Sequence, residues 1–137
     1  RQTYSNSVEA RKEVERRAVD LVLEMERRLG REPFEMPPNN RGFDIRSFDS
    51  SGKLIYLEVK GRISGSEIFT ITASEVAFAQ TQGDSHRLAL VDVSPEGKHQ
   101  DQVRYLTRAF DVLHLSERTA SINEKWLDYW QLGREPH

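Results

Sequence analysis

The chain lacks cysteine, and this absence excludes disulfide bonds, zinc–thiolate sites and thiol nucleophiles. The four histidines are scattered along the 137 residues and show no metal-ligand spacing. No apolar run approaches the ~20 residues that a membrane-spanning helix needs, and no secretory signal peptide is visible. We therefore expect a cytoplasmic protein without a membrane partner.

A dominant charge sign is also absent. The sequence holds 20 Lys and Arg against 22 Asp and Glu, which gives a net charge of -2. Overall charge therefore argues against tight non-specific DNA binding, although a local basic patch stays open.

The length is that of one domain. A chain of this size buries enough apolar surface to fold without disulfides or a structural metal. We therefore expect residues 1–137 to form a single domain. Because residue 1 is not methionine, we also expect this domain to be a piece of a larger protein.

Two short runs near the centre of the chain predict a β-hairpin. Along residues 54–61 apolar and polar side chains alternate, which places Glu58 and Lys60 on the same face of a strand. The run around Asp44 alternates in the same way, and residues 49–52 form a turn between the two runs. The hairpin therefore brings Asp44 beside Glu58 and Lys60.

Two carboxylates and a lysine at one place suit metal-dependent chemistry on a phosphodiester. Asp44 and Glu58 offer the hard oxygen ligands that Mg²⁺ or Mn²⁺ prefers, and a metal held this way lowers the pKa of a bound water. Lys60 would orient that water or stabilise developing negative charge. The alternative is that Glu58 and Lys60 are solvated residues on the wet face of a two-stranded ribbon.

The N-terminal part predicts a long helix, with Ser7 as N-cap, an end near Leu29 and a stop at Gly30. Its apolar residues recur at helical spacing and form one stripe. Glu15 falls at the border of that stripe, so it is the helix acid best placed to reach a site at the edge of the core. The alternative is a boundary glutamate paired with Arg11.

A second helix is predicted from Thr72 to about Gln82, and Thr72 and Glu75 have the form of a capping box. Glu75 and Gln80 could line the site, but capping alone explains Glu75. Gly61–Ser66, ahead of this helix, reads as a flexible glycine-rich turn with a possible phosphate contact from Arg62.

The remaining elements complete an α/β pattern. Trp126 and Trp130 share one face of a short C-terminal helix, where we expect them to pack on the sheet, with base stacking as the alternative. The order predicts a central mixed sheet covered by helices. The remaining predicted segments are strands at 34–36, 68–72, 87–93 (central and buried) and 102–106 (near an edge), an irregular stretch at 107–121 and a helix from about 123 to 132.

This order of motifs resembles the PD-(D/E)XK, or restriction-endonuclease-like, superfamily. Asp44 and Glu58-Val59-Lys60 match its central motif, and Glu15 matches the acid that some members carry on the first helix. The proline that often precedes the aspartate is replaced by Phe43. The resemblance implies a restriction-endonuclease-like fold, in which a central mixed β-sheet is flanked by α-helices.

A narrower resemblance covers residues 8–130. The chain is similar to the C-terminal domain named after protein NO VEIN, which is typically appended to SNF2-type or DEAD-box-type helicases and ATPases in bacteria. The motifs that carry this resemblance are Asn40-x-Gly42-Phe43-Asp44-Ile45-x-Ser47, Gly52, Leu57-Glu58-Val59-Lys60-Gly61-Arg62, Phe69-Thr70-Ile71-Thr72, Ser74-Glu75 and Leu88-Ala89-Leu90-Val91.

The resemblance implies a metal-dependent nuclease domain that acts on DNA as the C-terminal piece of a helicase or ATPase in bacterial defence or repair. Asp44 and Glu58 would bind Mg²⁺ or Mn²⁺, with the carbonyl of Val59 as a third protein ligand. Lys60 would position the water, and Glu15 would support the water or a second metal. The candidates for phosphate contacts are Arg41, Arg46, Arg62 and Arg87.

Two other functions stay open at this point. The domain could be a catalytically inactive module that binds nucleic acid or docks a partner, or it could only stabilise the motor protein. Members of this superfamily often act as dimers, so a homodimer also stays open, although no dimer surface is visible in the sequence.

Overall fold

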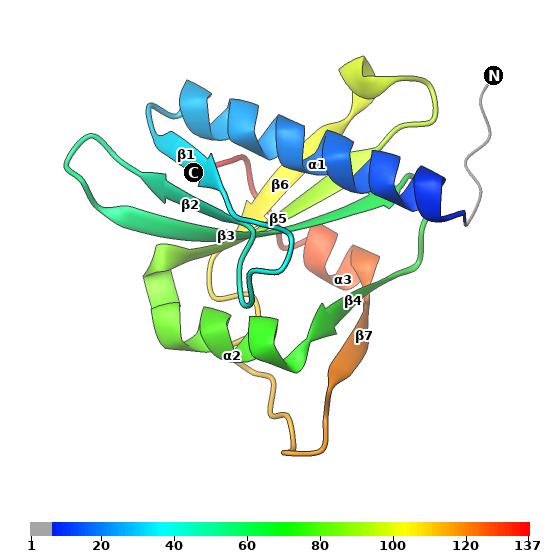
Figure 1. Cartoon of the computed structure of the whole chain (residues 1–137). Helices are drawn as coiled ribbons and strands as arrows, with labels where there is room; N and C mark the ends of the chain where they lie inside the picture. The colour runs from blue at the N-terminus through cyan, green and yellow to red at the C-terminus, as the bar shows by residue number, and fades with distance from the viewer. Residues whose placement is uncertain (1–6) are drawn as a thin grey trace.

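A long helix crosses one face of a five-stranded sheet in the computed structural model, which describes residues 7–137 (Figure 1). The helix, α1, spans Val8–Arg28. Neighbouring strands of the sheet are antiparallel except for β3 and β5, which are parallel, so the sheet is mixed as predicted. In sheet order, the strands are β1 (Glu32–Glu35), β2 (Ile45–Phe48), β3 (Leu54–Ile63), β5 (His86–Val93) and β6 (Gln102–Leu106).

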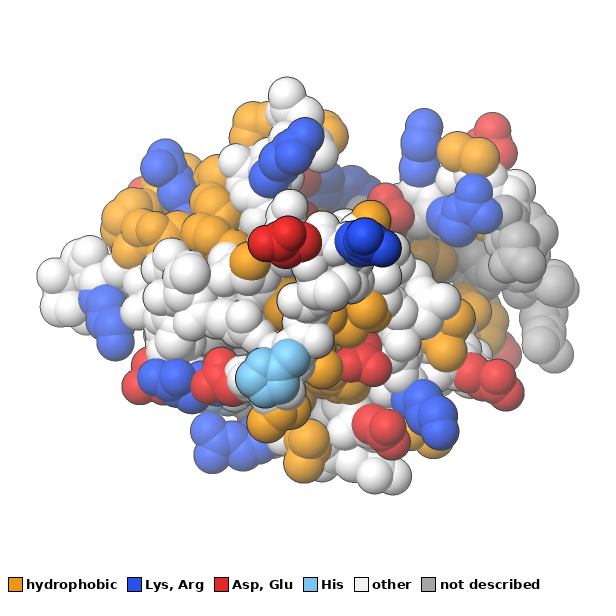
Figure 2. Space-filling view, turned by 90° about the horizontal axis from the view of Figure 1, so that it is seen from below, with side chains coloured by type: hydrophobic (Ala, Val, Ile, Leu, Met, Phe, Trp, Pro, Cys, Tyr) orange, Lys and Arg blue, Asp and Glu red, His pale blue; other side chains and the backbone are white. Residues whose placement is uncertain are grey.

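The opposite face of the sheet is covered by a second layer (Figure 1). It holds α2 (Ala73–Gln82), α3 (Trp126–Trp130) and a two-stranded antiparallel sheet of β4 (Ile68–Thr72) and β7 (Ser121–Lys125). Basic and acidic side chains are interspersed on the surface seen from below, so this face presents no patch of one sign (Figure 2). Two short 3-10 helices, Gly83–Ser85 and Lys98–Gln100, flank β5.

Each face of the five-stranded sheet buries its own apolar cluster. One cluster lies under α1 and includes Val22, Ile45 and Val91. The other lies between the sheet and the second layer and includes Phe69 and Trp126. This explains why β5 is almost continuously buried: its side chains point alternately into the two clusters, as expected for a central strand covered on both faces.

The start of α1 follows the predicted capping pattern. The hydroxyl of Ser7 accepts a hydrogen bond from the N–H of Ala10 at 3.1 Å, and Glu9 lies in the first turn, where the helix dipole favours an acid. The helix packs very closely on β3 at Gly61, because a Cβ added there would lie 2.5 Å from the Cβ of Ala18. Gly61 therefore sets how near α1 can approach the strand that carries Glu58 and Lys60.

Two predicted boundaries are wrong. Gly61 to Ile63 belong to β3, where they pair with β5, and are not part of a flexible turn. Residues 123–125, predicted as the start of a helix, form the end of β7 and pair with β4, so that α3 begins only at Trp126. The reason is that pairing with a strand fifty residues earlier in the chain overrides the weak local helix pattern.

A buried polar cluster under α1 was not predicted. The carboxylate of Glu26 is fully buried, accepts two hydrogen bonds from Arg31 at 2.6 and 2.8 Å, and accepts a third from the hydroxyl of Tyr105 at 2.8 Å. These bonds tie the C-terminal end of α1 to β6. Within residues 7–137, no helix combines the length and the apolar character that crossing a membrane requires.

Candidate active site

Asp44 is held by β3 from both its backbone and its side chain. It directly precedes β2, and its N–H donates to the carbonyl of Leu57 at 2.9 Å. Its carboxylate oxygen Oδ2 accepts the N–H of Val59 at 2.7 Å. The side chain of Asp44 therefore pairs with β3 where the regular ladder between β2 and β3 has ended, which places a carboxylate beside Glu58.

Glu58 is a buried acid with an incomplete set of partners. Only 1% of the residue is exposed, and as a carboxylate its oxygen Oε1 accepts no hydrogen bond in the described part of the chain; when protonated, the carboxyl shares a hydrogen bond with Asp44. Burial raises the pKa of the Glu58 carboxyl well above its usual value, and the charge of Asp44 raises it further, while Lys60 acts in the opposite direction. The site therefore destabilises the ionised form of Glu58 unless a cation joins it.

Lys60 bridges two acids from different elements. Its Nζ lies 3.4 Å from Oε2 of Glu58 and 3.1 Å from Oε1 of Glu75. Burial by itself would lower the pKa of Lys60, but the charges of Glu58 and Glu75 outweigh that effect and raise it. Lys60 is thus held as an ammonium ion within reach of both carboxylates.

Glu75 caps α2 as predicted, and it also contacts Lys60 in the cavity. Its Oε1 accepts the N–H of Thr72 at 2.9 Å, and the hydroxyl of Thr72 accepts the N–H of Glu75, so the capping box is complete. The same Oε1 accepts a hydrogen bond from Lys60. Gln80 is not part of the site, because its amide donates to the carbonyls of Phe110 and Leu113.

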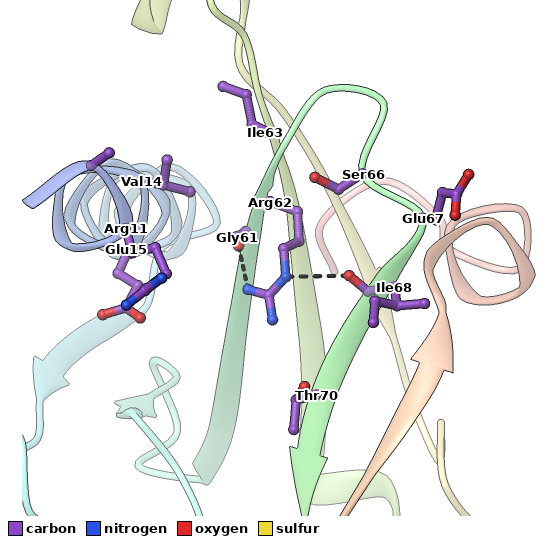
Figure 3. Close-up of a pocket in the computed structure, with 11 residues that line it drawn as sticks. Arg11, Val14, Glu15, Gly61, Arg62, Ile63, Ser66, Glu67, Ile68 and Thr70 are labelled. Carbon is purple, nitrogen blue, oxygen red and sulfur yellow. Dashed lines mark hydrogen bonds between the residues drawn. The ribbon is translucent and has the colours of Figure 1, made fainter. Parts of the chain in front are cut away.

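A cavity of about 400 Å³ brings these groups together with the helix acid. Asp44, Glu58, Lys60 and Glu75 line it, and Glu15 enters from α1. A second cavity of about 530 Å³ adjoins the first (Figure 3). The two cavities share the residues Glu15, Gly61, Arg62 and Thr70.

The four predicted arginines are divided by the fold. Only Arg62 lines the cavities. Arg46 is exposed on β2, and its guanidinium lies 5.6 Å from the ring centre of Phe34. Arg87 donates to the carbonyls of Asp84 and His137, and Arg41 is exposed in the loop that precedes β2.

An aromatic cluster behind Asp44 was not predicted. The rings of Phe43, Tyr56 and Phe78 lie with their centres 4.8 to 5.0 Å apart, which fixes the loop before Asp44 against β3 and α2. Gly42 is needed at this point, since its φ is +93° and an added Cβ would lie 3.0 Å from the Phe78 ring. Phe43 directly precedes Asp44, and its stacking on Phe78 holds the loop.

The donor set fits a divalent cation bound by few protein side chains. Asp44 and Glu58 supply carboxylate oxygens, one of which is buried and without a hydrogen-bond partner. Among residues 7–137, no group of three or more His, Asp or Glu side chains is arranged to hold a metal ion. A cation here would therefore need a backbone carbonyl, such as that of Val59, and water to complete its coordination, which is the usual pattern for Mg²⁺.

The overall fold matches that of a solved structure. The chain is 19% identical to Hjc from Archaeoglobus fulgidus, a Holliday junction resolvase from an archaeal hyperthermophile, with a TM-score of 0.54 over 90% of this chain and 91% of that one. At this identity the likeness concerns the fold, and it confirms the predicted restriction-endonuclease-like architecture. Among curated proteins, none matches the sequence.

The sequence itself matches a family over most of its length. The family described as Protein NO VEIN, C-terminal, covers residues 14–106, which include Asp44, Glu58, Lys60 and Glu75 as well as Glu15 from α1. The predicted resemblance is confirmed. This chain belongs to the family of C-terminal domains of protein NO VEIN.

Proposed function

We propose that this domain is a metal-dependent nuclease that hydrolyses phosphodiester bonds in DNA. One observation carries the proposal: Glu58 is buried with an unpartnered oxygen, next to Asp44 and in contact with Lys60. Buried polar atoms are rarely left without a hydrogen-bond partner, so the unpartnered oxygen points to a site that a bound group completes. That a Holliday junction resolvase has this fold supports the same reaction class.

Asp44 and Glu58 would hold Mg²⁺ or Mn²⁺, with the carbonyl of Val59 as the third protein ligand. When bound, such a cation lowers the pKa of a coordinated water and neutralises charge on a phosphate. The hydrogen bond from the N–H of Val59 fixes the orientation of Asp44 before any cation arrives. The protein therefore presents its ligands with little rearrangement.

Lys60 would position the attacking water or the phosphate oxygen that gains charge. Its Nζ is already anchored by Glu58 and Glu75, which limits the positions that the ammonium can take. Glu15 faces the same cavity from α1 and would hold the water or a second cation. Arg62, at the border of both cavities, would bind phosphate, whereas Arg41, Arg46 and Arg87 would contact DNA only farther from the site.

The setting of this activity is also part of the proposal. The domain would act as the C-terminal piece of a helicase or ATPase in the bacterial cytoplasm, in DNA defence or repair. A chain with a net charge of -2 has little general attraction for DNA, so the motor domain would add to the local binding at the site and would deliver the substrate. A homodimer is compatible with this arrangement.

A second candidate function is a catalytically inactive module that binds nucleic acid or a partner. It is favoured by the engagement of Lys60 with Glu75 and by the lack of three convergent acids in the described residues. The two functions differ in what divalent cations do. Only the nuclease requires them for a chemical change in DNA.

Cleavage assays on plasmid and single-stranded DNA test the proposal. The wild type should cut at least one of them with Mg²⁺ or Mn²⁺ and neither with EDTA. Asp44→Asn and Lys60→Ala should each lower the rate by at least about 10²-fold. Arg28→Ala, an exposed substitution at the far end of α1, is the matched control and should cut at the wild-type rate. Cutting by Asp44→Asn at the wild-type rate would rule out this site.

A further inference from the structure

The cavity beside the acidic site differs from that site in having apolar walls. It lies between α1 and β4 (Figure 3), and its walls include the apolar side chains of Val14, Ile63 and Ile68. Ile68 is unusually exposed for its type, at 48%. A volume of about 530 Å³ falls in the range of small-molecule sites and suits one nucleotide. An apolar wall of this kind fits the face of a nucleobase.

Arg62 lies where this cavity meets the acidic one. Its Nε donates to the carbonyl of Ile68 at 3.3 Å, and its Nη1 donates to the carbonyl of Gly61 at 2.8 Å. Nη2 makes no hydrogen bond to any residue from 7 to 137, and in the same range no carboxylate lies within 4 Å of the guanidinium. Figure 3 shows the guanidinium between β3 and β4, with Glu15 and Arg11 across the cavity on α1.

The charge of Arg62 is only partly compensated. Burial lowers the pKa of its guanidinium, and the more distant charge of Glu15 offsets part of that effect. A half-buried cation held by carbonyl dipoles gains most from an anion that completes its hydrogen bonds. Phosphate is such an anion, and the planar fork of arginine matches its oxygens.

The functional side chains follow one another along a single strand face. Alternate positions of β3 carry Glu58, Lys60 and Arg62, so all three side chains point to the same side of the strand. Each of them is ~6.6 Å along the strand from the next. This step is similar to the separation of neighbouring phosphates in an extended nucleic-acid strand. When one phosphate of a nucleic-acid strand lies at Lys60, the next phosphate along that strand therefore lies close to Arg62.

We propose that the cavity at Arg62 is a subsite for the nucleotide next to the scissile phosphate, and that the domain consequently takes single-stranded DNA in preference to duplex. Arg62 binds the neighbouring phosphate, and the wall of Val14, Ile63 and Ile68 takes the base. A base can enter such a cavity only when it is unpaired, so paired DNA must first be separated. The inference rests on the proposed function for the position of the scissile phosphate.

Binding without cleavage tests this proposal. We would measure the fluorescence anisotropy of a labelled oligothymidylate, the same strand with one abasic position, and a hairpin duplex, all in EDTA. The wild type should bind the intact strand about tenfold more tightly than the duplex. Arg62→Ala should lose about tenfold in affinity for the strand. The slope of its log affinity against log salt concentration should decrease by the amount expected for the loss of about one phosphate contact.

A second variant tests the base-binding part. Ala10 lines the cavity from α1 and is partly exposed, so Ala10→Trp fills the cavity without disturbing the core. It should weaken binding of the intact strand but leave the abasic strand unchanged. Arg28→Ala removes the same charge as Arg62→Ala at the other end of α1 and should leave every affinity unchanged.

The outcomes separate this inference from the proposed function. Equal or tighter binding of duplex, no binding of the single strand, or equal effects of Arg62→Ala and Arg28→Ala would each overturn the subsite. Cleavage that persists after such a result leaves the nuclease proposal standing. Conversely, preferential binding of the single strand without metal-dependent cleavage would support a nucleotide-binding site at Arg62 and contradict the nuclease activity.

Discussion

The N–H of Val59 donates to the carboxylate of Asp44 at 2.7 Å, so a side chain rather than a backbone carbonyl continues the pairing of β3. This bond gives Asp44 a structural role alongside the metal-binding role proposed for it. The two roles can be separated, because asparagine retains an oxygen that can accept the N–H of Val59, while alanine does not.

Asp44→Asn and Asp44→Ala should therefore differ in stability. Both variants remove the charge that repels Glu58, but only Asp44→Ala leaves the N–H of Val59 without an acceptor. We expect Asp44→Ala to be about 1–2 kcal/mol less stable than Asp44→Asn, as measured by urea unfolding without divalent cations. Equal stability of the two variants would mean that the bond contributes nothing measurable.

The buried Glu58 should make the protein less stable as the pH rises. Its pKa is raised in the folded state, mainly by burial, so between its usual value of 4.5 and the folded-state value the folded protein holds the proton more tightly than the unfolded one. Stability from this group is fully present below the unfolded pKa and is lost as the pH rises through the folded one.

Glu58→Gln should remove this pH dependence. We expect the variant to unfold at higher urea concentration than the wild type at pH 7 without divalent cations, and the difference should vanish as the pH falls toward 4.5. Adding Mn²⁺ should stabilise the wild type and leave the variant unchanged. A variant that is less stable than the wild type at pH 7 would contradict the origin assigned to the raised pKa.

The buried acid of α1 should matter far more than its exposed neighbour. Glu26→Ala leaves Arg31 without its buried counter-charge and Tyr105 without its acceptor, and we expect a loss of about 3–5 kcal/mol in the free energy of unfolding. The matched control is Glu24→Ala, which breaks an exposed pair with Arg28 and should cost at most about 0.5 kcal/mol. Stability losses of similar size for Glu26→Ala and Glu24→Ala, measured by thermal and urea unfolding, would argue against a structural ion pair at Glu26.

The contact between Gly61 and Ala18 should control the spacing of α1 and β3. Gly61→Ala places a methyl group 2.5 Å from the Cβ of Ala18, and we expect a loss of about 1–3 kcal/mol together with weaker activity, because Glu15 moves with the helix. Ala18→Gly on the same background should recover part of the stability that Gly61→Ala loses. Additive losses in the double variant would contradict a direct clash.

Strand periodicity was sufficient to predict which side chains lie together at the centre of the candidate site. Alternation alone places Glu58 and Lys60 on one face, and the short turn at 49–52 places Asp44 beside them. The helical period likewise placed Glu15 at the edge of the core, where it lines the acidic cavity. These inferences succeed because they depend on residues that are close in sequence.

What could not be predicted depends on contacts between distant segments. The burial of Glu26 is recognisable only once Tyr105 lies beside it, and the aromatic cluster of Phe43 needs Phe78 from α2. The double role of Glu75 likewise requires α2 to begin next to β3. The strand β7 was missed because its partner β4 lies fifty residues earlier in the chain.

Calorimetric titration with Mn²⁺ tests the central claim most directly, on the wild type and on Asp44→Asn. We expect the wild type to bind Mn²⁺, and to bind it more weakly as the pH falls, since burial raises the pKa of Glu58 and a protonated carboxyl is a poor metal ligand. Asp44→Asn, folded as judged by its unfolding curve, should show no binding. Absence of binding by the wild type, or equal binding by both proteins, would contradict a metal site at Asp44 and Glu58.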